Sequence, residues 1–337
     1  SAVQLGFILG TLIFALLSIS DRYSPSRVFF FCATLAALSN LSILWAPNLG
    51  SLLVLRSLTG ICLAGIYPVG MKIAADHHRK SLGTALGFLI GALVLGTAFP
   101  HLLKSITGLF NWEDVIIGTS LLAVLGGLSI LLLVPDGPYR KPGSKIDLST
   151  VFTIFRNKDF RSAAFGYFGH MWELYGFWAF VPVILITYQQ SHPEVHLDIS
   201  ATSFLIIGSG SLACVAGGFA AKRWGSYNTA RTALMLSLLC CLFSPILFTL
   251  PLNWFLAIVF AWSMAVIADS PQFSTLIAHS APAESKGTAL TMVNCLGFSI
   301  TIISLMAISW LREQVAPENL YLFLSPGPLL GLLAMRK

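Results

Sequence analysis

The sequence predicts an all-α protein that crosses a membrane many times. Of its 337 residues, 56% are hydrophobic and only 10% are charged, and the mean hydropathy is +0.81. Soluble domains carry about 25% charged residues, so this chain has too little charge to cover a water-facing surface. The composition also excludes disorder, a collagen-like repeat and a disulfide scaffold, because the chain has no Gly-X-Y period and its 6 cysteines all lie within apolar runs.

Eleven apolar stretches are long enough to cross a bilayer as helices, which takes about 20 residues. We place them at 2–18, 28–47, 51–75, 82–103, 114–134, 163–188, 200–221, 230–250, 254–278, 287–310 and 320–335. They are continuously apolar, whereas the strands of a membrane β-barrel alternate apolar and polar residues. The stretches therefore predict helices.

The distribution of Lys and Arg predicts which helix ends face the cytoplasm. If the loop after the first stretch is cytoplasmic, seventeen basic residues fall on that side and two, Lys104 and Arg312, on the other. Because basic loops favour the cytoplasm, we expect Ser1 outside and Lys337 inside. The formal net charge of +6 thus belongs to one membrane face. No basic stretch is interleaved with aromatic residues, so nucleic-acid binding is excluded.

Three pairs of landmarks indicate two copies of one helical bundle. They are Leu17–Ser24 with Gly218–Gly225, Gly83–Leu86 with Gly287–Leu290, and Pro68 with Pro271. The offsets between the copies are 201 residues from Asp21 to Lys222, 204 from Gly83 to Gly287, and 203 between the prolines. Such agreement is typical of parallel repeats related by an axis along the membrane normal.

The repeat predicts the domain organisation. We expect an N-terminal bundle at 1–134, a cytoplasmic linker rich in Pro and Gly at 135–161, and a C-terminal bundle at 162–337. The counterpart of the stretch 163–188 would lie ahead of Ser1 at this offset, so we also expect a further span there in the native protein.

Two motifs add a family resemblance to the repeat. The loop after the first stretch follows roughly Gly-x-x-x-Asp-Arg-x-Gly-Arg-Arg through Asp21, Arg22 and Arg27, with Leu17 and Ser24 where glycines are usual. Its second copy keeps Gly218, Arg223 and Gly225 but has Lys222 at the acidic position. The third stretch follows Arg-x-x-x-Gly-x-x-x-Ala through Arg56, Gly60 and Ala64. In these features the chain resembles the major facilitator superfamily.

The resemblance implies a fold and a mechanism. The fold is all-α, with two six-helix bundles, of which this chain would hold eleven helices of twelve, from helix 2 to helix 12. The mechanism is secondary transport of a small-molecule substrate by alternating access, without a cofactor or a metal. A proton or another coupling ion and membrane lipid are the further partners, and nothing in the sequence indicates an oligomeric state. The charged residues of the two loops would gate the conformational change: Asp21, Arg22, Arg27, Lys222 and Arg223.

Two further runs are similar to one branch of the superfamily. Ile66–Lys72 and Leu93–Pro100 look like the bacterial permeases for nitrate, nitrite and cyanate, which implies a bacterial cytoplasmic membrane. Nitrate carriers are expected to use arginines inside helices 2 and 8, and the corresponding stretches 2–18 and 200–221 contain none.

Four ionisable residues lie inside predicted spans, where each costs about 2.5–3.5 kcal/mol on insertion scales. They are Arg56, His170, Glu173 and Asp269. In the family the helices that correspond to theirs, 4, 7 and 10, line the central cavity, so the resemblance implies that these residues bind substrate or couple it to protons. Tyr67 and Gln272, which flank the two equivalent prolines, are expected to be polar contacts of the same cavity.

Glu173 is the residue that we expect to carry a coupled proton. It lies roughly 16 Å from the cytoplasmic start of its helix, which is near the midplane, and His170 shares its helix face. A carboxyl group in apolar surroundings favours its neutral form and can therefore carry a proton. Arg56, near the outer end of its helix, could hold an anionic substrate. The structural alternatives are an interhelical ion pair or hydrogen bond for Glu173 and Asp269, and a helix-end anchor for Arg56.

Two helical features are expected to serve packing. Gly83, Gly87 and Gly91 recur every fourth residue, a pattern that permits close approach of a second helix. Pro271 is expected to bend its helix beside Asp269, because proline removes a backbone donor.

Other classes of function compete with transport. The motif His170-x-x-Glu173 has a spacing that can bind a metal, but no second pair of ligands converges with it, so we expect neither a metal site nor an enzyme. An ATP-driven pump is excluded because no Gly-x-x-x-x-Gly-Lys-Ser/Thr loop occurs. A non-transporting relative, a receptor or an assembly subunit stays as the alternative.

Overall fold

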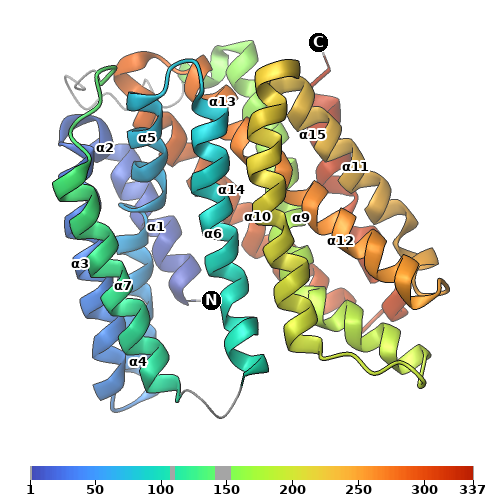
Figure 1. The fold of residues 1–337 in the computed structure, drawn as a ribbon. Coiled ribbons are helices and arrows are strands. Elements are labelled where there is room, and N and C mark those ends of the chain that lie inside the picture. The colour runs from blue at the N-terminus through green and yellow to red at the C-terminus, as the bar shows by residue number, and fades with distance from the viewer. Residues whose placement is uncertain (1, 107–110, 141–152, 337) are drawn as a thin grey trace. The chain divides into compact units, whose positions relative to one another are not determined.

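The structure, a computed structural model, describes residues 2–106, 111–140 and 153–336. Over these residues every regular element is a helix and no strand occurs (Figure 1). The all-α prediction is confirmed. The predicted linker at 135–161 lies partly outside the described residues, at 141–152.

The membrane spans are built mainly from single helices and from pairs of helices in line. The single ones are α6 (Leu82–Ser105), α7 (Trp112–Leu133), α9 (Lys158–Ser191), α10 (Ile199–Trp224) and α11 (Ser226–Leu247). The paired or extended ones are α3 (Pro25–Leu41) with η1 (Ser42–Trp45), α4 (Leu49–Leu63) with α5 (Tyr67–His77), α12 (Leu252–Ala268) with α13 (Ser270–Ser280), and η3 (Ala283–Ser285) with α14 (Lys286–Leu311). Within the described residues these make nine segments long and apolar enough to cross a membrane.

The first and last of the eleven predicted stretches are shorter than these nine. The first is α1 (Ala2–Leu16), which has 15 residues and is followed by the short α2 (Ile19–Arg22). The last consists of the 3-10 helix η4 (Pro317–Leu324) and α15 (Pro326–Ala334), which has 9 residues. The nine long segments match the predicted stretches to within a few residues.

Two spans are interrupted beside the equivalent prolines. The segment Leu49–His77 is broken at 64–66, just before Tyr67 and Pro68 open α5. The segment 252–280 is broken at Asp269, just before Ser270 and Pro271 open α13. Proline has no N–H to donate and fits the first turn of a helix, so each helix restarts there. The predicted bend beside Asp269 is confirmed.

The chain divides into two compact units. Unit 1 comprises Ser1–Leu82, Gly108–Arg161 and Ile277–Ser299, and unit 2 comprises Gly83–Thr107, Ser162–Leu276 and Ile300–Lys337. This grouping of the described helices by contact differs from the sequence halves 1–134 and 162–337, which stay a prediction.

Unit 1 packs α3 against both α4 and α7, and α4 against α1 (Figure 1). Small residues let α1 approach α4 closely: a Cβ on Gly6 would lie 2.1 Å from the Ser57 carbonyl oxygen. Across α3 and α7, the Asn40 amide donates to the Ser120 hydroxyl at 3.0 Å.

Unit 2 packs α10 against α11, α12 and the glycine face of α6. A Cβ on Gly87 would lie 2.6 Å from the Cys214 carbonyl oxygen, and one on Gly218 would lie 2.8 Å from that of Gly83. Larger side chains would force these helices apart, so the predicted role of the glycine pattern in close packing is confirmed.

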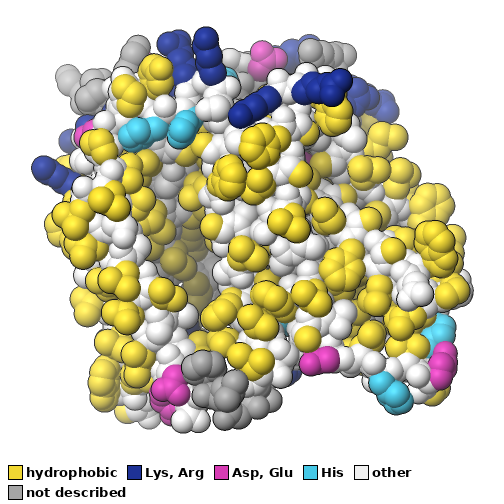
Figure 2. All heavy atoms as spheres, in the orientation of Figure 1, with side chains coloured by type: hydrophobic (Ala, Val, Ile, Leu, Met, Phe, Trp, Pro, Cys, Tyr) yellow, Lys and Arg dark blue, Asp and Glu magenta, His cyan; other side chains and the backbone are white. Residues whose placement is uncertain are grey.

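The outer flanks of the helices are apolar. Large side chains such as Leu122, Leu133 and Leu212 are more than 60% exposed. Figure 2 shows hydrophobic side chains along the helix flanks of the visible face and Lys and Arg gathered at helix ends. A surface of this kind suits contact with lipid chains rather than with water.

Candidate functional site

The carboxyl group of Glu173 lies at the centre of a buried polar cluster in unit 2. Glu173 is on α9 and has no exposed surface. Its Oε1 accepts a hydrogen bond from Trp262 Nε1 of α12 at 2.8 Å and one from Cys241 Sγ of α11 at 3.2 Å. Its Oε2 accepts a hydrogen bond from the Ser237 hydroxyl, also of α11. We call Glu173, Ser237, Cys241 and Trp262 the Glu173 cluster.

The Glu173 cluster contains no cation. In the described part of the chain, no Lys, Arg or His forms a hydrogen bond or an ion pair with Glu173. Burial without a counter-ion disfavours an ionised carboxylate, whereas three hydrogen-bond donors favour it. Glu173 is thus a buried carboxyl group that has hydrogen-bond donors but no counter-ion among the described residues.

A second buried pair lies one helical turn away. His170 Nδ1 is 2.8 Å from Asp269 Oδ1, and the two residues are 1% and 0% exposed. Asp269 occupies the break between α12 and α13, and its carboxyl group interacts electrostatically with that of Glu173. The structure thus brings together three of the predicted site residues, two of them carboxylic acids, in unit 2.

Gln272 lies in the same unit on α13 and is fully buried. Among the described residues, neither its amide oxygen nor its amide nitrogen has a hydrogen-bond partner. The amide oxygen faces α6, since a Cβ on Gly83 would lie 3.0 Å from it. A buried amide without partners can be satisfied by a polar ligand or a water molecule.

The remaining predicted contacts, Arg56 and Tyr67, lie in unit 1. Arg56 of α4 is half-buried, and its guanidinium donates to Asn40 Oδ1 at 3.4 Å. No carboxylate of the described residues pairs with Arg56, so its charge stays available to an anion. Tyr67 is the half-buried first residue of α5.

Among the predicted gating residues, Asp21 makes the most extensive contacts. Its carboxylate accepts hydrogen bonds from the backbone N–H groups of Gly287 and Thr288 at 3.0 and 2.7 Å and from the Thr288 hydroxyl at 2.8 Å. These donors lie in the first turn of α14, where N–H groups lack partners within the helix and the helix dipole favours a negative charge. We call this contact the carboxylate cap.

A buried lysine completes the surroundings of Asp21. Lys72 of α5 is 0% exposed, and its Nζ lies 3.4 Å from Asp21 and 2.9 Å from Asp76. The two acidic residues surround one cation, so Lys72 keeps Asp76 as a partner when the charge of Asp21 is removed.

The other four predicted gating residues are exposed. The side chains of Arg22 and Arg27 form no ion pair or hydrogen bond with any residue that the structure describes. In unit 2, Lys222 lies 5.0 Å from the centre of the Phe219 ring, and Arg223 is exposed beside it.

The sequence did not identify Lys72 and Asp76, nor the three donors of the Glu173 cluster. Lys72 and Asp76 are spaced i, i+4 in a helix, a spacing that pairs opposite charges, and this was an available signal. The sequence gives no such signal for the three donors, Ser237, Cys241 and Trp262. They are neutral residues in apolar helices, and their sequence positions do not indicate which distant residue they contact. No group of three or more metal-ligating side chains occurs among the described residues.

A sequence profile of the Major Facilitator Superfamily matches residues 1–305. The chain belongs to this superfamily. The match is to the superfamily as a whole, and assignment to the nitrate, nitrite and cyanate branch stays a prediction.

One relative, an uncharacterized MFS-type transporter named YybF from Bacillus subtilis strain 168, is 21% identical over 127 residues, which are 37% of this chain and 31% of the relative. The matched region thus spans less than a third of the relative's length.

Solved structures share the fold over 99% of this chain. The human organic anion transporter MFSD10 (TETRAN) has a TM-score of 0.81 at 18% identity, with 82% of its own chain covered. The Escherichia coli fucose:proton symporter FucP has a TM-score of 0.70 at 12% identity, and 88% of its chain is covered. A bacterial homologue of the iron transporter ferroportin, in an outward-facing state, has a TM-score of 0.70 at 15% identity, and 88% of its chain is covered.

These similarities establish the superfamily fold. Sequence identities this low do not indicate which substrate the protein binds. This member of the superfamily is an integral membrane protein with several spans. Its family is one of transporters, so the chain is assigned to transporters and not to enzymes.

Proposed function

We propose that this protein is a secondary active transporter that moves a small organic or inorganic anion by alternating access and couples the movement to protons. The observation that carries the proposal is the Glu173 cluster: a carboxyl group with 0% exposure that three neutral donors contact. A structural carboxylate in a span is normally paired with a cation. Glu173 has none among the described residues, and its protonation offers another way to remove the charge.

Two neighbouring residues extend this proton site. His170 and Asp269 are in contact at 2.8 Å, one turn along α9 from Glu173. A proton that leaves one carboxyl group lowers the cost of protonating the other, because the two negative charges repel. Asp269 also lies at the break between α12 and α13, where a change in its charge would act directly on helix geometry.

The choice of an anion rests on Arg56. Its guanidinium is half-buried in α4 and faces only the neutral oxygen of Asn40 among the described residues. Arg binds carboxylate and phosphate groups through two parallel hydrogen bonds. The likeness to an organic anion transporter and to a proton symporter is compatible with both parts of the proposal. We further propose that the C-terminus faces the cytoplasm of a bacterial cell.

Uptake into proteoliposomes tests the proposal. Lactate, succinate, benzoate and nitrate, with fucose as a neutral comparison, are offered with and without a pH gradient. Wild-type protein should accumulate at least one anion only when the gradient is present. Glu173→Gln, which mimics the protonated group at nearly equal volume, should keep exchange at equal pH and lose accumulation. Glu194→Gln is the matched control, because Glu194 is exposed in the same unit.

A spectroscopic measurement tests the proton step without a substrate. The infrared difference spectrum between acidic and neutral pH should contain a carboxyl C=O band that Glu173→Gln removes and Glu194→Gln retains. If Glu173→Gln leaves both the band and gradient-driven uptake intact, Glu173 is structural and the proton must move through Asp269 and His170. If no variant or gradient affects any solute, the non-transporting alternative gains support.

A further inference from the structure

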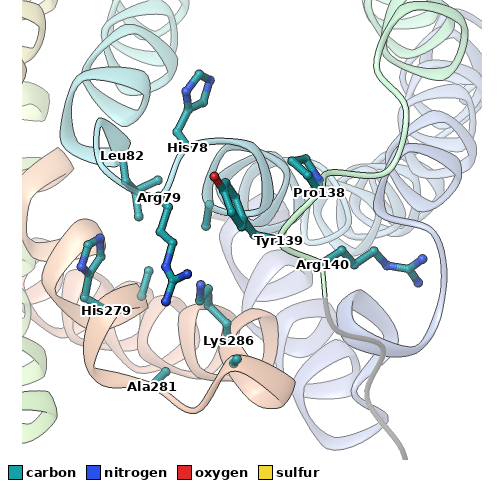
Figure 3. A pocket seen from close by; sticks show the side chains of 12 residues that line it. His78, Arg79, Leu82, Pro138, Tyr139, Arg140, His279, Ala281 and Lys286 are labelled. Carbon is teal, nitrogen blue, oxygen red and sulfur yellow. The ribbon is translucent and has the colours of Figure 1, made fainter.

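Unit 1 contains a cavity that the proposed transport site does not include. Its volume is about 450 Å³. Three segments line it: the end of α5 with the following loop, residues 138–140, and the end of α13 with the loop that leads to the first residue of α14 (Figure 3). Its polar lining residues include Arg79, Tyr139, Arg140, His279 and Lys286. We call this cavity the basic pocket.

Two cations of the basic pocket face one another. In Figure 3 the guanidinium of Arg79 and the ammonium group of Lys286 point into the same space. Neither forms an ion pair with a carboxylate of the described residues. Like charges directed at one space repel each other, so the arrangement is stabilised by an anion placed between them.

The acidic residues near the pocket are already engaged. Both carboxylate oxygens of Asp76 accept hydrogen bonds from Lys72, at 3.1 and 2.9 Å, and Asp21 forms the carboxylate cap. Asp136 pairs with Arg140 at 2.6 Å, and in Figure 3 Arg140 points away from Arg79 and Lys286. These three acidic residues are paired with other groups, and Arg79 and Lys286 form no ion pair with them.

The walls of the basic pocket are held in place by specific contacts. The backbone N–H of Tyr139 donates to the Asp76 carbonyl at 3.0 Å, which ties the segment 138–140 to the end of α5. Gly137 allows this approach, since a Cβ there would lie 2.4 Å from the same carbonyl oxygen. The Tyr139 ring in turn lies 5.9 Å from the Arg79 guanidinium carbon and orients that side chain.

We infer that the basic pocket binds a phosphate group, held by Arg79 and Lys286. Arg forms paired hydrogen bonds with phosphate oxygens and Lys provides a point charge. The cavity is large enough for a phosphate with a substituent. The phosphate can belong to a free compound or to the head group of a phospholipid, because the pocket lies at helix ends.

The experiment has one arm for each source. In the first, detergent-purified full chain is titrated with sodium pyrophosphate at constant ionic strength, and Tm is followed. In the second, protein mixed with phosphatidylglycerol or phosphatidylcholine is examined by native mass spectrometry for retained lipid. Arg79→Gln and the double variant Arg79→Gln with Lys286→Gln are compared with wild type. Lys80→Gln is the matched control, since Lys80 is exposed in the same loop but does not line the cavity.

A phosphate site predicts saturable binding that the double variant weakens at least tenfold and Arg79→Gln weakens severalfold, with Lys80→Gln unchanged. Loss of the pyrophosphate effect assigns a free phosphate compound, and loss of phosphatidylglycerol retention alone assigns a lipid head group. The inference is overturned if the double variant binds both probes like wild type, or if potassium chloride reproduces the effect. Arg79 is exposed, so Arg79→Gln should fold normally, and its Tm without ligand checks this.

Discussion

The carboxylate cap of α14 predicts a measurable effect of Asp21→Asn. The substitution removes the negative charge that accepts three hydrogen bonds from Gly287 and Thr288 and lies 3.4 Å from Lys72. The amide keeps one acceptor oxygen but turns an NH₂ group toward a donor. Lys72 keeps Asp76 as its partner, but hydrogen bonds to a charged group contribute about 1.5–3 kcal/mol each, so the loss of two of the three costs at least about 3 kcal/mol. Each 1.4 kcal/mol is a factor of about ten, so the contact between α2 and α14 should open at least about 100-fold more often.

Hydrogen exchange of the α14 amides measures this opening directly. The N–H groups of Gly287 and Thr288 donate to Asp21, and they exchange with solvent only when the contact opens. In Asp21→Asn their exchange should accelerate about 100-fold at fixed pH, in proportion to the opening free energy. Arg22→Gln is the control, because the neighbouring Arg22 is exposed and should leave the rates unchanged.

Two results would refute this reasoning. Unchanged exchange at Gly287 and Thr288 in Asp21→Asn would show that the carboxylate does not hold the start of α14. Substrate affinity measured with the protein locked in one state should be nearly the same as in wild type, and a large loss there would instead place Asp21 in the binding site.

Two further predictions concern packing and orientation. Gly218→Leu should lower Tm by several degrees, because its side chain would meet the Gly83 carbonyl 2.8 Å from the Cβ position, whereas Gly118→Leu, with open space around its Cβ position, should change Tm little. Cysteine at His196, but not at Lys80, should react with an impermeant maleimide added to right-side-out vesicles, above the labelling of wild type. The opposite pattern would reverse the proposed orientation of the chain.

Much of the fold was predictable because hydropathy and proline act locally. The nine long segments and the break beside Pro271 follow from the composition of contiguous residues. The broken segment 64–66 shows the limit of this approach, since the stretch 51–75 reads as one continuous apolar run. Hydropathy measures whether a segment enters the membrane and does not measure whether its helix is continuous.

The candidate site was predictable only at residues whose insertion into a membrane costs free energy. Glu173, His170 and Asp269 stood out because ionisable groups are rare in spans, and the structure brings them together. Lys72 groups with the basic loop residues by sequence although it is fully buried, because a sequence does not show which end of a long span turns inward. Arg22 and Arg27 match a motif but are exposed.

The two copies of the Gly-Thr-Ala-Leu sequence have diverged in what their threonines contact. The Thr288 hydroxyl donates to a side chain, Asp21, whereas the Thr84 hydroxyl donates to the backbone carbonyl of Gly218 at 3.0 Å. A substitution can remove a side-chain acceptor, whereas no substitution removes a backbone carbonyl. The Thr288 contact thus depends on which side chain stands at position 21, whereas the Thr84 contact depends on a backbone atom and on the small size of Gly218.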